Sequence, residues 1–217
     1  MGSVVSVNVA RVRTGSWTGR VGRTGIDKRP ADTSVAFGPT GVGGDVVCDT
    51  QHHGAWYQAV YAFDLDELAH WSEWLGTSLV PGNAGENLTV RGVDSSSAVL
   101  GQRWGIGGAV LRVTGPRTPC SVFAGFWDAP RLVRSFTERG RTGAYLAVER
   151  SGHIAVGDQV RVLSTPDHGV RVHEVFALNM LGRDELAEHV RNGLVDLPDE
   201  WRERTARSLR RCGVAVS

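Results

Sequence analysis

The sequence predicts a mainly β fold, a barrel or a sandwich with a few helices packed against it. Short alternating or β-branched runs recur along the first 165 residues. Glycines make up 28 of the 217 residues and fall between these runs, where they supply turns. The hydrophobic share of 41% is enough for a core, and the charged share of 22% is ordinary, which argues against general disorder.

Seven strands are expected from these runs. They are placed at residues 3–9, 34–37, 59–63, 98–104, 109–114, 143–148 and 159–163. In the first, Val5, Val7 and Val9 fall on one face, because side chains alternate along a strand. Seven short strands with close turn signals are typical of barrels and sandwiches.

Two helices are expected within this β-rich part. Asp64 followed by Glu67 matches a capping box at a helix start, and Gly76 would end that helix. Asp128 is expected to begin a second helix, because apolar residues follow it at helical spacing up to Gly140.

The character of the chain changes after Pro166. Residues 184–192 and 198–211 read as helices, so we expect a β domain over residues 1–166 and a helical C-terminal segment over residues 167–217. The last helix carries five arginines interspersed with acids, which favours a solvated face over a phosphate or nucleic-acid site. A homodimer contact through this tail is a further alternative.

Charge and motifs exclude several classes of function. The net charge of +1 argues against general nucleic-acid binding. No apolar run approaches the ~18 residues of a membrane span. The charges at the N-terminus follow the apolar run, the reverse of a secretory signal, and the three cysteines are too few for a disulfide scaffold, so we expect a cytoplasmic protein. A P-loop, a dinucleotide fingerprint, a zincin motif and a serine-hydrolase elbow are all missing.

The three cysteines differ in their sequence setting. Cys212 near the end is read as incidental, and Cys48 stands among aspartates that disfavour a thiolate. Cys120 lies in GPRTPCSVF, three residues after Arg117 in a loop that two prolines stiffen. A fixed thiol near a guanidinium is suited to act as a thiolate. A buried structural cysteine is the alternative.

Two polar clusters are candidates for a pocket. Asp49, His52 and His53 form a weak match to a zinc site, because a second ligand pair is missing, and surface histidines are the alternative. Residues 81–88 (PGNAGENL) form a tight loop that exposes backbone N–H groups, with Glu86 as a candidate pocket acid.

A third candidate is the basic turn of residues 24–30 (TGIDKRP). Lys28 and Arg29 could bind a phosphate, one as a point charge and the other as a fork. An ordinary basic surface turn is the alternative.

Taken in order, four stretches resemble the MOSC family, named after the C-terminal domain of molybdenum-cofactor sulfurases. They are the GD-x3-D-x2-HHG pattern from residue 44, PGNAGENLTVRG, LGQRWGIGGAVLRVTGPRTPC and GAYLAVERSGHIAVGDQV. The resemblance runs over roughly residues 3–165 and implies a β-barrel-like core. The tail resembles the stand-alone bacterial branch, which includes proteins that detoxify 6-N-hydroxylaminopurine.

The resemblance implies a molybdenum cofactor, a pyranopterin whose dithiolene holds the metal. Cys120 matches the family cysteine that ligates molybdenum or carries sulfur, and a soft thiolate suits such a metal. Arg117, Thr118 and Pro119 match the loop that precedes this cysteine. The resemblance implies that Lys28 and Arg117 hold the pterin or its phosphate and that Gly85, Glu86 and Asn87 line the pocket. It further implies that Asp49 and His53 deliver protons. The usual His-Gly-Gly is here His53-Gly54-Ala55, which could block a backbone approach at residue 55.

The resulting hypothesis is a molybdenum-dependent oxidoreductase that reduces N-hydroxylated small molecules, N–OH to N–H. Because no flavin or nicotinamide motif is present, the electrons would come from an external reductase. One alternative is a sulfur carrier or cofactor-binding module with a persulfide on Cys120 and no turnover of its own. Another is a non-catalytic β-barrel binding protein whose motifs have decayed.

Overall fold

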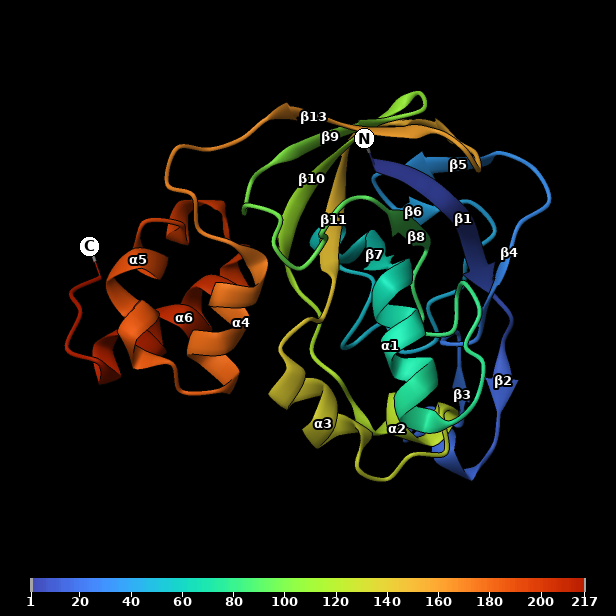
Figure 1. The fold of residues 1–217 in the computed structure, drawn as a ribbon, viewed down its shortest axis with the longest axis horizontal. Helices are drawn as coiled ribbons and strands as arrows, with labels where there is room; N and C mark the ends of the chain where they lie inside the picture. Colours follow the sequence, from blue (N-terminus) through green and yellow to red (C-terminus); the bar gives the residue numbers. More distant parts are fainter. Residues whose placement is uncertain (1, 217) are drawn as a thin grey trace.

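A seven-stranded closed barrel forms the centre of the molecule (Figure 1). The computed structural model describes residues 2–216. The barrel strands follow one another as β13 (Gln159–Ser164), β9 (Arg103–Ile106), β10 (Ala109–Pro116), β11 (Ala144–Arg150), β7 (Val60–Asp64), β8 (Leu88–Arg91) and β1 (Gly2–Ala10). The barrel closes because β1 pairs with β13, through Gly2 opposite Val160 and Ser3 opposite Gln159. Only β7 and β8, among the described strands, run parallel.

Smaller strands lie outside the barrel. β4 (Lys28–Pro30) pairs with the outer part of β1. β2 (Arg13–Thr14) and β3 (Arg23–Thr24) form a short hairpin, with a 3-10 turn at Ser16–Thr18 between them. β5 (Val35–Gly38), β6 (Gly41–Val42) and β12 (Gly152–Ile154) form a separate three-stranded sheet.

The helices cover two sides of the barrel (Figure 1). α1 (Leu65–Leu75), α2 (Ser121–Phe126) and α3 (Leu132–Arg139) lie near the end that also carries β2 and β3. α4 (Val172–Met180), α5 (Ala187–Arg191) and α6 (Asp199–Arg211) form a group beside β10. Short 3-10 turns lie at Trp56–Gln58, Asp184–Leu186 and Leu194–Asp196. Within residues 2–216, the helices are all too short or too polar to cross a membrane.

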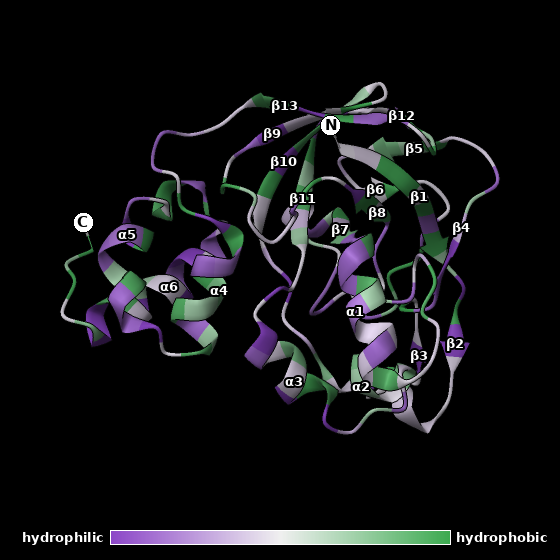
Figure 2. Cartoon of the chain, in the orientation of Figure 1, coloured by the Kyte–Doolittle hydropathy of each residue, from purple (hydrophilic) through white to green (hydrophobic). Residues whose placement is uncertain are grey.

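Two apolar clusters hold these elements together. The larger fills the barrel and continues into the helical tail, where Val175 and Leu209 are buried with Trp104 and Leu111 of the barrel. Figure 2 shows hydrophobic residues on strands such as β1 and β10 and mixed colours along α4 and α6. Because one core spans both parts, the tail is packed as a cover on the barrel. The expected boundary between residues 166 and 167 stays a prediction.

The second cluster is aromatic and lies among α1, α2 and α3. Trp71 stacks on Phe136 with ring centroids 5.2 Å apart, and Phe136 lies edge-on to Phe123 at 5.3 Å. Such pairs contribute roughly 0.5–1.5 kcal/mol beyond the area they bury. This packing fixes α2, and therefore the position of the residue that precedes it, Cys120.

The predicted mainly β fold with a barrel core is confirmed. The expected strands agree with the observed ones within two residues, except that 98–104 becomes a single bridge at Val99 followed by β9. β8 was not expected as a strand, because its four residues follow directly on a turn-rich loop. α2 and α4 were not expected either. The helices at the end of the tail match the expectation, as α6 does at residues 199–211.

α1 begins after Asp64 and ends at Gly76 as predicted, but the capping-box hydrogen bonds do not form, and the start predicted for α3 was wrong. The Asp64 carboxylate does not cap α1; it accepts the Ser95 N–H at 3.1 and 3.2 Å. Glu67, the expected second half of the capping box, instead pairs with Arg139 and Arg141 at 2.6 Å each. α3 begins at Leu132 rather than after Asp128. In each case a tertiary partner or the end of the preceding helix decides the position of the side chain.

The buried Asp64 carboxyl predicts a pH-dependent stability. Burial raises its pKa to about 7, against an ordinary value of 3.8. The native state therefore keeps a proton that the unfolded chain releases, so this group makes stability fall as pH rises from about 4 to about 7. We expect Asp64→Asn to gain about 1–4 kcal/mol relative to wild type between pH 4.5 and pH 8 in urea unfolding. The exposed Asp66→Asn is the control; a constant difference between Asp64→Asn and wild type at all pH values would contradict the prediction.

Candidate functional site

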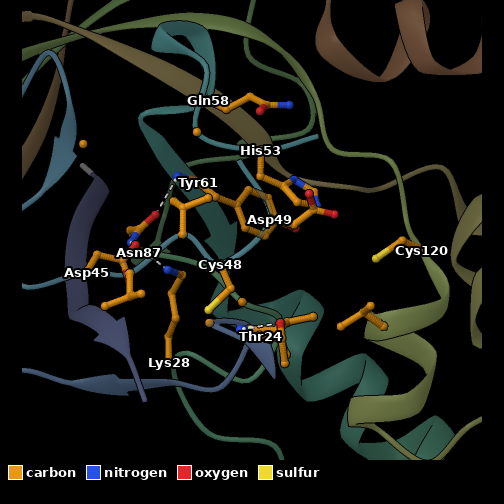
Figure 3. A pocket seen from close by; sticks show the side chains of 18 of the residues that line it. Thr24, Lys28, Asp45, Cys48, Asp49, His53, Gln58, Tyr61, Asn87 and Cys120 are labelled. Atoms are coloured by element: carbon orange, nitrogen blue, oxygen red, sulfur yellow. Dashed lines mark hydrogen bonds and ion pairs between the residues drawn. The ribbon is translucent and has the colours of Figure 1, made fainter. Parts of the chain in front are cut away.

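A cavity opens between the β2–β3 hairpin, the loop of residues 40–54 and the loop that leads into α2. Its lining brings together eight of the ten residues predicted from the sequence, namely Lys28, Asp49, His53, Gly85, Asn87, Arg117, Thr118 and Cys120. Figure 3 shows Cys120 facing this space from the side opposite Lys28, with His53, Asp49 and Tyr61 between them. Segments far apart in the chain therefore meet at one end of the barrel.

Cys120 occupies the position immediately before α2. Its backbone is extended, and its carbonyl accepts the N–H groups of Phe123 and Ala124, which start the helix. The side chain is a free, half-buried thiol. A thiol held at a helix start, with part of its surface open to a cavity, can act as a ligand or nucleophile without the backbone moving.

Arg117 is the most unusual charge in the cavity. It is 6% exposed, and its guanidinium carbon lies 4.0 Å above the Phe123 ring and 5.2 Å from the Tyr61 ring. Among residues 2–216 it forms no ion pair with a carboxylate, and its buried Nη1 has no hydrogen-bond partner. The guanidinium is held by these aromatic rings and by a hydrogen bond to Tyr145, and among the described residues no carboxylate neutralises it. A buried cation without a counter-ion beside Cys120 is suited to an anionic ligand.

Lys28, by contrast, has a partner. Its ammonium group contacts the Asp45 carboxylate, and Asn87 Nδ2 donates to the same Asp45 oxygen at 2.8 Å. Burial lowers the pKa of Lys28, while the neighbouring Asp45 acts in the opposite direction. Asp45 also accepts the Ala10 N–H at 2.7 Å, so this carboxylate joins the loop of residues 40–54 to β1, β4 and the residue before β8.

The two histidines separate into different roles. Asp49 Oδ2 lies 3.1 Å from His52 Nδ1, on the exposed side of the loop, whereas His53 lines the cavity. Desolvation by the surrounding protein atoms and the positive charge of Arg117 lower the pKa of His53. Partial burial raises the pKa of Asp49, but the hydrogen bonds from His52 and Gln51 outweigh it and lower the pKa overall. At neutral pH the cavity thus holds a neutral imidazole beside an ionised carboxylate.

Glu86 and Pro119, also predicted as site residues, do not line the cavity. The Glu86 carboxylate is fully buried and accepts the Gly82 N–H at 2.7 Å, the Ala84 N–H at 3.0 Å and the Thr89 hydroxyl at 2.7 Å. Contrary to the expected pocket acid, it holds its own loop in shape. The shape of this loop requires glycine at position 82, because a Cβ atom there would lie 2.3 Å from the Lys28 carbonyl oxygen.

Several lining residues were not assigned to the site from the sequence. Tyr61 and Tyr145 come from β7 and β11, with ring centroids 5.5 Å apart, and strand alternation alone does not tell which strand end faces a cavity. Gln58 and Arg23 also line it, as does Cys48, which the sequence indicated to be a poor thiolate. Ala55, the departure from the family's glycine, is not among the lining residues, so it does not narrow the cavity.

Comparison with known proteins agrees with this geometry. The family model for the MOSC domain matches residues 49–161, just over half of the chain. The chain belongs to the MOSC family. The protein YflK of Bacillus subtilis (strain 168) is 30% identical and covers 82% of this chain and 80% of its own length.

Other MOSC relatives are more distant. A protein named "Reductase" from Gibberella moniliformis is 27% identical over 76% of this chain, and the match spans only 30% of that longer protein. The crystal structure of YiiM from Geobacillus stearothermophilus superimposes with a TM-score of 0.78 at 24% identity, covering 96% of this chain and all of that one. The structural likeness confirms the MOSC fold, including the helical tail.

Because no carboxylate of the described residues neutralises Arg117, we expect that removing its charge increases the stability of the protein. Arg117→Met keeps the packing on Phe123 and removes the uncompensated charge, so we expect the ligand-free protein to gain about 1 kcal/mol in urea unfolding. The matched control is Arg139→Met, because Arg139 pairs with the buried Glu67 and its loss should destabilise. Destabilisation by both substitutions to the same extent would show that Arg117 is already compensated.

The Glu86 contacts predict a structural effect. Glu86→Gln replaces an acceptor of three hydrogen bonds by an amide that must point its NH2 group at one of the donors. We expect a loss of about 1–3 kcal/mol in unfolding free energy, against almost none for the exposed Glu73→Gln. A neutral Glu86→Gln would contradict the loop-holding role.

Proposed function

We propose that this MOSC protein binds a molybdenum cofactor in the cavity and reduces N-hydroxylated small molecules, with electrons from a separate reductase. The observation that carries the proposal is the buried, unpaired Arg117 beside the free thiol of Cys120 in one cavity. A cation and a soft sulfur ligand together suit an anionic group that brings its own metal.

The residues present fit such a group. Within the described part of the chain, no cluster of three or more His, Cys, Asp and Glu side chains is placed to hold a bare metal ion. A metal carried by an organic sulfur ligand needs fewer protein ligands, and Cys120 can supply one thiolate. Arg117 is the cation that would hold an anionic part of the cofactor, and Gly85, Asn87 and Thr118 line the space around it. Lys28 lines the same space but is already paired with Asp45.

When bound, the cofactor would supply two-electron chemistry that takes up the oxygen of the N–OH group. The balanced reaction is R–NH–OH + 2 H⁺ + 2 e⁻ → R–NH2 + H2O. His53 lines the cavity with a lowered pKa, so it can pass protons to the leaving oxygen and take them back from solvent. Asp49 holds the start of the same turn, because its carbonyl accepts the His53 N–H at 3.0 Å.

The electron source is proposed to be a separate flavin or iron–sulfur protein. The sequence contains no motif for a nicotinamide or a flavin. The fungal relative named "Reductase" supports this arrangement, because its MOSC-like part is joined to a much longer chain. In the present chain the corresponding function would be supplied in trans.

The proposal is tested by cofactor content. Protein from a host that makes the cofactor should carry close to one molybdenum and one pterin per chain, and Cys120→Ala should lose most of the metal. Cys212→Ala, remote from the cavity, is the matched control. Wild-type protein without molybdenum would overturn the proposal; one extra sulfur atom on Cys120 in such protein would favour the sulfur-carrier alternative.

A proton-delivering His53 predicts a pH profile. The imidazolium form is the donor, and because the pKa of His53 is lowered, kcat/KM should rise as pH falls from 7.5 to 5.5. His53→Gln should flatten this rise and lower kcat roughly 10²-fold, whereas the exposed His52→Gln should keep the profile. The measurement is turnover of an N-hydroxylated amine with a reduced viologen dye as donor. An unchanged slope in His53→Gln would exclude this role.

A further inference from the structure

The basic turn that the sequence marked as a phosphate site is neutralised within the fold. Lys28 is paired with Asp45, and Arg29 lies 2.7 Å from the buried Asp27, which Arg13 also contacts at 3.0 Å. The two cations expected to hold a phosphate therefore already have carboxylate partners. A cation that binds a further anion at the cavity must therefore lie outside this turn.

Arg23, which directly precedes that turn, lines the cavity and has no carboxylate partner among residues 2–216. It lies on β3, is exposed and lines the cavity, so it stands at the mouth. Across residues 2–216 its side chain takes part in no ion pair or hydrogen bond. Thr24 and Gly25 follow it along the same wall. The neighbouring Arg20 also lines the cavity, but it already contacts Gln51 at 2.7 Å and Asp49 at 3.6 Å.

The charges that line the cavity do not cancel. Arg20, Arg23, Lys28 and Arg117 face Asp45 and Asp49. Asp45 forms an ion pair with Lys28, and Asp49 forms one with Arg20. In the part of the chain that the structure describes, Arg117, deep and buried, and Arg23, at the mouth, have no carboxylate partner. The buried Arg117 independently supports an anionic ligand in the cavity, and Arg23 provides a second positive centre farther out.

The backbone holds Arg23 in place. β3 pairs with β2 through Thr14 opposite Arg23. Gly25 packs directly on the loop of residues 40–54, since a Cβ atom there would lie 2.1 Å from the Val46 carbonyl oxygen. The hairpin is thus seated against the cavity wall, and Arg23 does not depend on a mobile loop for its position.

We infer that Arg23 binds the phosphate group of the substrate, so that the substrates are phosphate monoesters of N-hydroxylated bases or amines. A planar guanidinium binds phosphate oxygens with two parallel hydrogen bonds, and the Thr24 hydroxyl can donate a further one. Arg117 and Cys120 would serve the cofactor at the inner end, and Arg23 would fix the distal end of the substrate. This inference rests on the proposed function and names its substrate class.

The kinetic test uses two substrates that differ only in the phosphate, N6-hydroxyadenosine 5′-monophosphate and N6-hydroxyadenosine. Wild type should show a KM roughly tenfold lower for the monophosphate. Arg23→Gln should remove that difference and leave the neutral nucleoside unaffected. Arg11→Gln is the matched control, because Arg11 is an exposed arginine of the same segment that does not line the cavity. Equal KM values for both substrates in wild type would overturn the inference.

A binding test is independent of turnover. Adenosine 5′-monophosphate, which has no N–OH group, is titrated calorimetrically into the molybdenum-loaded protein. Binding should weaken roughly tenfold in Arg23→Gln, stay unchanged in Arg11→Gln and be partly retained in Arg23→Lys. Equal affinity of wild type and Arg23→Gln would overturn the inference even if neither nucleoside is reduced, which would count against the proposed function alone.

The cofactor's own phosphate is the other source of the same chemistry. Pterin and molybdenum contents of Arg23→Gln separate the two. Contents equal to wild type, together with a raised KM for the monophosphate, support a substrate-binding role. A loss of pterin from Arg23→Gln would assign Arg23 to the cofactor and overturn the substrate assignment.

Discussion

The Asp45 carboxylate is the interaction on which the cavity depends. One oxygen accepts the Ala10 N–H of β1, and the other meets the Lys28 ammonium of β4 and the Asn87 amide before β8. The loop of residues 40–54 is thereby fixed to three elements at one end of the barrel. That loop carries Cys48, Asp49 and His53 to the cavity. This anchor therefore helps to fix the wall opposite Cys120.

The other side of the cavity is fixed by apolar packing. The aromatic cluster of α1, α2 and α3 seats Phe123, which supports both the Arg117 guanidinium and the helix that begins after Cys120. One wall of the cavity is thus held by the Asp45 contacts and the other by aromatic packing, and the lining between them carries more positive than negative charges. The paired charges maintain the structure, and Arg117 and Arg23, which have no carboxylate partner among the described residues, are the charges that we propose for ligands.

Sequence reasoning reached most of the fold because the barrel strands carry strong local signals. β10 and β11 are rich in β-branched and apolar residues, and their bounds were predicted within two residues. β8 was not predicted because its sequence, LTVR, is short, and α4 was not predicted because VHEVFALNM is apolar enough to suit a strand or a helix. Most of the candidate site residues meet in one cavity. Glu86 does not, because a buried acid within a tight loop can serve the loop as well as a pocket.

The sequence by itself determined the mainly β class, the MOSC resemblance and the cysteine that stands beside an arginine. These follow from alternation, turn residues and ordered motifs, which are local properties of the chain. Only the tertiary structure decided which charges are neutralised. Lys28 and Arg29 looked available in the sequence, yet their partners are Asp45, seventeen residues from Lys28, and Asp27 in a buried setting. Because an ion pair depends on distance in space and not along the chain, only the folded structure could identify Arg117 and Arg23 as the arginines of the cavity that lack a carboxylate partner within residues 2–216.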